Sequence, residues 1–98
     1  MVNFNFSASD LKTAIYALCE LSEYLMYSED STPERRAFAI RYQHLSDALA
    51  NHVPDLTGDD LRHMCIALKF VLEYEPMNWS ASQLLGRLAP VCGFVDVP

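Results

Sequence analysis

The sequence predicts an all-α fold: a compact four-helix bundle of two antiparallel helical hairpins, with short extended N- and C-terminal segments. Three observations support this prediction. Apolar residues recur at helical spacing in four segments, as in amphipathic helices. Side chains that cap helices precede these segments, and prolines at positions 33, 54, 76 and 90 delimit them. We therefore expect helices at about residues 8–28, 33–52, 58–75 and 81–89.

Three of the predicted helices begin with the same capping pattern. A Ser or Thr can accept a hydrogen bond from an unpaired backbone N–H, and an acid or amide three residues later can accept one from the cap's own N–H. These pairs are Ser7 with Asp10, Thr57 with Asp60, and Ser80 with Gln83. The remaining helix is expected to begin with Thr32 as cap and Pro33 as its first residue, where the missing N–H removes no helical bond.

The chain repeats itself at an offset of fifty residues. Aligning residues 7–24 with 57–74 gives six identities in eighteen positions. A duplicated helical hairpin and convergent amphipathic patterning both explain this similarity. Either origin predicts similar environments for the first and third helices, and two units are too few for a solenoid.

The first and third predicted helices differ on the side away from their shared apolar stripe. The first helix carries Tyr16 and Glu20 there, whereas the third carries Ile66 and Phe70. A helix that is apolar nearly all round must be covered nearly all round. The cover is either the fourth helix with the terminal segments, or a second copy of the protein or another partner.

The second helix and the two chain ends complete the predicted packing. Apolar spacing in the second helix predicts burial of Phe38, Tyr42, Leu45, Leu49 and Val53, with Ile40 on the polar side. Residues 3–6 alternate in polarity, and residues 91–97 are rich in β-branched and aromatic side chains. We expect both ends to dock on the bundle as extended covers, although they can instead pair with each other or reach a neighbour.

Composition excludes several classes of protein. We interpret residues 1–98 as a single helical domain, because the length leaves no room for a second. The net charge of −6, spread evenly over both halves, argues against direct binding to nucleic acid or to an anionic membrane. No apolar stretch approaches the ~20 residues of a membrane span, and the start has no basic signal-peptide region. Three widely spaced cysteines without a C-x-x-C favour the reducing cytoplasm.

No motif points to catalysis or to a bound group. Asp59 and His63 stand four residues apart, as two metal ligands on one helix would, but further ligands are not evident and acids in a first turn suit the helix dipole. No serine nucleophile turn and no glycine-rich phosphate loop is present. Cys19 and Cys65 fall near apolar stripes, and Cys92 falls in the predicted tail. We expect no enzyme activity, metal, cofactor or small-molecule substrate.

These observations favour a non-enzymatic protein–protein interaction domain. It either self-associates, as a homodimer for example, or docks on a protein partner. The expected contact residues are Ile66 and Phe70, followed by Tyr16, Tyr27 and Ile40. The tyrosines belong to a cluster with Tyr24 on the less apolar side of the first helix, and tyrosine is enriched at interfaces.

An acidic inhibitor is the alternative hypothesis. Small acidic phage-type proteins can occupy the basic surface of a nucleic-acid-binding protein and so regulate it. Such a mimic needs its carboxylates in a row, and the even spread of charge weakens the idea. The row to look for is Glu20, Glu23, Glu29 and Asp30.

Overall fold

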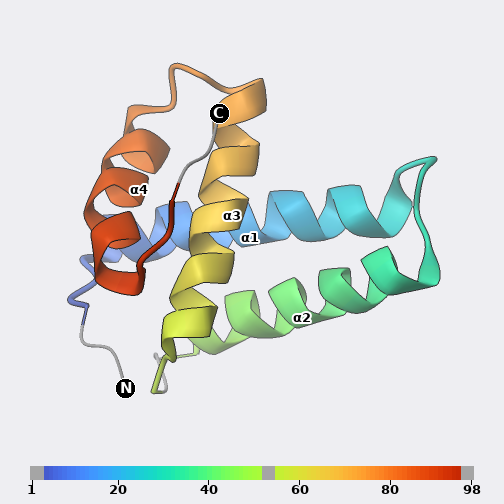
Figure 1. The fold of residues 1–98 in the computed structure, drawn as a ribbon, viewed down its shortest axis with the longest axis horizontal. Coiled ribbons are helices and arrows are strands. Elements are labelled where there is room, and N and C mark those ends of the chain that lie inside the picture. The colour runs from blue at the N-terminus through green and yellow to red at the C-terminus, as the bar shows by residue number, and fades with distance from the viewer. Residues whose placement is uncertain (1–3, 52–54, 96–98) are drawn as a thin grey trace.

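The fold is the predicted all-helical bundle of two hairpins. A computed structural model describes residues 4–51 and 55–95 of the chain. In these ranges it contains four helices and no strand: α1 (Ala8–Tyr27), α2 (Pro33–Ala50), α3 (Gly58–Tyr74) and α4 (Trp79–Cys92). α1 packs along α2, and α3 along α4 (Figure 1). The radius of gyration of 12.7 Å matches the ~13 Å of a compact domain of this length.

The two hairpins cross each other. In Figure 1, α3 runs across α1 instead of along it, and the ends of α1 and α2 nearest their connection project beyond α3. α1 is the central element, since it packs on each of the other three helices. None of the helices in the described part of the chain is long and apolar enough to cross a membrane.

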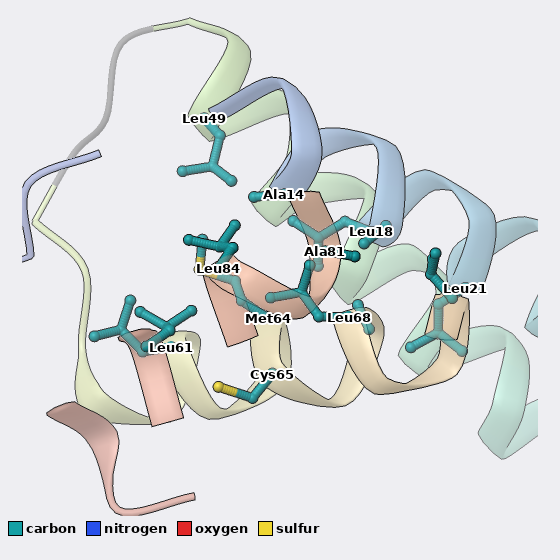
Figure 2. Packing of buried hydrophobic residues seen from close by; sticks show 14 of the residues in the cluster. Ala14, Leu18, Leu21, Leu49, Leu61, Met64, Cys65, Leu68, Ala81 and Leu84 are labelled. Carbon is teal, nitrogen blue, oxygen red and sulfur yellow. The ribbon is translucent and has the colours of Figure 1, made fainter. Parts of the chain in front are cut away.

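The core lies where the hairpins cross. Figure 2 shows side chains of α1, α3 and α4 meeting there, and Leu49 of α2 lies at one edge. Burial of these apolar side chains is the main stabilising contribution to the fold. The largest fully buried side chains are Leu18, Leu61, Met64, Cys65, Leu68, Leu84 and Leu88.

The first three helices begin as the sequence predicts. Ser7 Oγ accepts from the Asp10 N–H at 3.0 Å, and the Asp10 carboxylate accepts from the Ser7 N–H at 3.0 Å. Thr57 and Asp60 form the equivalent pair of bonds at 3.1 and 3.0 Å. Thr32 caps α2, whose first residue is a proline. Acids occupy the first turns of all three helices, where they face the positive end of the helix dipole.

The prediction for α4 was wrong at both ends. The helix begins at Trp79 because Asn78, not Ser80, is the cap and accepts from the Ala81 N–H at 3.1 Å. Pro90 does not end the helix, which continues to Cys92. Cys92 lies one turn after Leu88 and both are buried, so apolar contacts hold the last turn together around the proline. Gly93 then ends α4 in the left-handed conformation at φ 70°.

The inward face of α2 also differs from the prediction. Phe38 is 48% exposed, whereas Ala39 is fully buried against α1 and its carbonyl accepts from Ser22 Oγ at 2.9 Å. Tyr42 and Leu49 are buried as predicted, and Leu45 is half-buried. Phe38 lines an open apolar hollow with Leu21 and Leu25 of α1 and Ile66 of α3, so these neighbours cover it only in part. Val53 falls outside the described residues.

The described parts of both chain ends dock on the bundle. Phe4 and Phe6 pack on the core with their ring centroids 4.7 Å apart, and Phe94 packs on it from the other end. Residues 91–92 belong to α4 and not to an extended tail, which corrects the prediction. Cys92 is consequently buried, with its Sγ 3.7 Å from that of Cys65. Residues 3, 96 and 97 of the expected end segments lie outside the described ranges.

Candidate functional site

A groove forms where the projecting end of α1 meets the C-terminal half of α3. It encloses about 580 Å³, and we call it the α1–α3 groove. Four aromatic side chains and three carboxylates account for most of its lining, which Ser28 and Val71 complete. The aromatic residues are Tyr24, Tyr27, Phe70 and Tyr74, and the carboxylates belong to Glu20, Glu23 and Glu75.

The aromatic rings of the groove form a connected row. Phe70 lies between Tyr24 and Tyr74, with ring centroids 5.1 and 5.0 Å away and the rings tilted. Such pairs attract each other beyond their apolar burial. Tyr27, one turn beyond Tyr24 on α1, is 82% exposed. The row is therefore anchored at Phe70 and open to solvent at its outer rings.

The carboxylates of the groove share its described lining with no basic side chain. Among the described lining residues none is Lys or Arg. The ion pairs that join two described residues involve Asp10 and Asp59, and Glu20 and Glu23 take part in none of these. Glu75 accepts from the Tyr16 hydroxyl and, at 3.2 Å, from the Asn78 amide. The bond to Glu75 raises the pKa of Tyr16 to about 12.

A second, apolar hollow lies one turn back along α3. It is lined by Leu21, Leu25, Phe38, Tyr42, His63 and Ile66, and encloses about 360 Å³. Ile66 and Phe70 are four residues apart and so lie on the same side of α3. The α1–α3 groove and this apolar hollow together form one face, which we call the docking face.

The structure brings together three of the five predicted contact residues. Ile66, Phe70 and Tyr27 lie on the docking face. Tyr16 is outside the lining and holds Glu75, which is part of it. Ile40 does not line the docking face but an adjoining hollow of about 490 Å³, which shares Glu23 and Tyr27 with the α1–α3 groove.

Sequence reasoning left Tyr74 and Phe38 out of the site. Tyr74 follows Phe70 by one turn and aligns with Tyr24 in the fifty-residue repeat, so the signal for it was present. Phe38 carried no such signal, because its exposure depends on where α3 crosses the other hairpin. Sequence periodicity describes a helix face but not how far along the helix a neighbour covers it.

Asp59 and His63 join α3 to α2. Asp59 accepts from Arg41 and Arg62, and the Tyr42 hydroxyl lies 3.0 Å from His63 Nδ1. The bond from Arg41 lowers the pKa of Asp59, while burial and the Arg41 charge lower the pKa of His63. Within the described ranges no group of three or more residues is placed to hold a metal ion. The contacts give both side chains a role in holding two helices together.

The cysteines occupy structural positions. Burial, followed by the neighbouring Cys92, raises the pKa of Cys65 to about 12, which keeps it a thiol and not a thiolate. Cys19 Sγ lies 3.3 Å from Ser46 Oγ between α1 and α2. All three cysteines are free thiols. None of them has the exposed, electropositive surroundings of a reactive thiol.

Comparison of the chain with protein families, with curated proteins and with solved structures finds no match. A function for the docking face is therefore inferred from its geometry alone.

Proposed function

We propose that the protein is a non-enzymatic interaction module that docks on another protein through its docking face. The supporting observation is the exposed aromatic row of the α1–α3 groove, with the apolar hollow one turn back along α3. Contiguous apolar surface on a small domain marks interaction sites, and tyrosine is among the residues that contribute most to binding energy. The free thiols support a place in the reducing cytoplasm.

Charge favours a different protein over a second copy. A symmetric dimer places the same surface patch of both copies against itself. Pairing two α1–α3 grooves would bring Glu20, Glu23 and Glu75 of each copy together, and no Lys or Arg among the described lining residues would separate them. Like charges placed against each other across an interface weaken binding by several kcal/mol. A partner of opposite or neutral charge avoids this cost.

The acidic-inhibitor alternative has partial support. Glu20 and Glu23 line the α1–α3 groove together with Glu75. Glu29 and Asp30 are exposed in the connection between α1 and α2, outside the groove lining. An inhibitor that covers a basic surface would use the groove carboxylates with the acids of this connection, so it would bind over a wider area than the groove.

Substitutions that change shape but not charge test the docking face. The face variant combines two substitutions on the docking face, Ile66→Gln and Tyr74→Gln. The control variant carries Val91→Gln on α4. Val91 and Ile66 are equally exposed, at 41%, so the control is matched in exposure to the Ile66 substitution. Each variant would be used as bait in the source cell and checked for folding by circular dichroism.

The expected result is a partner held by the native chain and by Val91→Gln, and lost by the folded face variant. Light scattering should report a monomer at tens of micromolar. Capture that is unaffected by the face variant would overturn the proposal. A dimer that the face variant separates would replace the proposed partner with a second copy.

A further inference from the structure

We infer that the segment occupying the α1–α3 groove is a cationic amphipathic helix of the partner protein. Its Lys or Arg side chains would meet Glu20 and Glu23, and its apolar side chains would pack on the aromatic row. This inference rests on the proposed function and specifies the chemistry of the partner.

Charge is the first step. Neither Glu20 nor Glu23 takes part in the ion pairs that join two described residues, and no described Lys or Arg lines the groove. An apolar partner would move these carboxylates out of water without compensation, which is costly. A cationic side chain placed against them offsets that desolvation. It also suits the exposed rings of Tyr27 and Tyr74, since a cation over an aromatic face is attracted to it.

Spacing is the second step. Glu20, Glu23, Tyr24 and Tyr27 occupy positions i, i+3, i+4 and i+7 of α1, so each carboxylate is followed by a ring one turn later along one face. This face is about 10 Å long at 1.5 Å per residue. A partner helix with apolar and basic residues at the same spacing presents matching groups over about two turns. Helices that dock in grooves use this set of anchor positions.

Shape is the third step. The groove is bounded by α1 on one side and by α3 on the other, and the apolar hollow beside Ile66 lies one turn back along α3. The apolar side chains of a docked helix can reach Phe70 and Ile66 in turn, since these are one turn apart on α3. Nucleic acid is excluded as an occupant, because its phosphates would face the same carboxylates.

A synthetic peptide tests the inference directly. The probe is a peptide of about 15 residues with Leu at i, i+3, i+4 and i+7, a few Lys beside them and Ala elsewhere, because Ala-rich chains of this length form marginally stable helices. The matched peptide replaces every Lys with Gln. Both would be titrated by calorimetry into the native chain and into two variants, Glu20→Gln with Glu23→Gln, and Glu29→Gln with Asp30→Asn. The two variants remove the same charge from the groove and from the α1–α2 connection.

We expect the Lys peptide to bind the groove variant about tenfold more weakly than the native chain, because close charge pairs across an interface are coupled. Binding to the Glu29 and Asp30 variant should change less than about twofold, since exposed charges away from the contact are screened. The Gln peptide should bind the native chain at least as weakly as the Lys peptide binds the groove variant.

The outcomes separate the inference from the proposed function. Equal weakening by both charge variants would show a non-specific attraction and overturn the inference. Equal binding of the two peptides, lost on Ile66→Gln with Tyr74→Gln, would overturn the cationic partner and leave the docking face standing. Binding that is unaffected by any variant of the docking face would overturn both.

Discussion

Helices α1 and α3 share a sequence pattern and bury the same face, but they end differently. At an offset of fifty residues the buried pairs coincide: Ala14 with Met64, Ala17 with Ala67, Leu18 with Leu68, and Leu21 with Val71. α3 stops at Tyr74, two residues before Pro76, whereas α1 passes the equivalent Tyr24 and continues to Tyr27. The difference follows from one position, because Met26 of α1 is the equivalent of Pro76 after α3. Proline disfavours the continuation of a helix.

The additional turn of α1 contributes lining residues to the docking face. It carries Leu25 and Tyr27, which project past α3 and line this face. The two helices also differ in the residues on the side away from the core. Phe70 of α3 is the equivalent of Glu20 of α1 and provides the central ring of the groove. A shared buried face therefore builds the core, and the positions at which the two helices diverge build the candidate site.

The largest expected effects test the shared face. Leu18→Ala and Leu68→Ala each remove a fully buried side chain at equivalent positions. We expect each to lower the free energy of unfolding by about 2–5 kcal/mol, through lost burial and the cavity left behind. Urea denaturation measures both. A small loss at one position with a large loss at the other would contradict the equivalence of the two helices.

A smaller effect separates the two helix starts. Asp10 and Asp60 complete the same capping box, but only the Asp10 carboxylate also binds Arg87 of α4. The bond from Arg87 lowers the pKa of Asp10. We expect Asp10→Ala to destabilise by about 2 kcal/mol and Asp60→Ala by about 1 kcal/mol or less. In a double-mutant cycle, Arg87→Ala should couple to Asp10→Ala and not to Asp60→Ala.

Acid should destabilise the protein in two ranges of pH. The pKa of His63 is lowered from 6.5 in the folded chain, so the unfolded chain binds the proton more readily and stability falls as the pH drops below 6.5. The lowered pKa values of Asp10 and Asp59 add stability above pH 3.8, which is lost as the pH falls through those lowered values. Urea midpoints measured from pH 8 to about pH 2 should follow this course. His63→Gln should flatten the upper range alone, and an unchanged slope there would contradict this assignment.

Most of the fold could be predicted because its signals are local. Capping side chains, apolar spacing and prolines each act within a few residues, and they placed the first three helices correctly. The error at Pro90 is instructive, because the proline was interpreted as a stop. Tertiary contacts of Leu88 and Cys92 decide that end of α4, and local propensity does not contain them.

Less of the candidate site could be predicted. Ile66 and Phe70 were selected because a helix that is apolar all round needs a cover, which is a property of one helix. The groove depends on how far α1 projects beyond α3, and that follows from the crossing of two hairpins. Ile40 illustrates what the sequence of one helix cannot predict. Like Ile66 it is an apolar residue on the polar side of its helix, but it lines a different hollow.

The smallest expected effect lies just past the end of the repeat. Ser28, the C-cap of α1, is there the equivalent of Asn78. Ser28 Oγ is buried without a hydrogen-bond partner among the described residues, whereas Asn78 caps α4 and donates to Glu75. Asn78→Ala should therefore cost about 1 kcal/mol. Ser28→Ala should change stability by less than about 0.5 kcal/mol, or raise it, because it removes an unsatisfied group and Ala adopts the extended backbone of Ser28 without strain. Urea denaturation of both variants measures the contrast, and a loss at Ser28 as large as that at Asn78 would show that the hydroxyl is bonded after all.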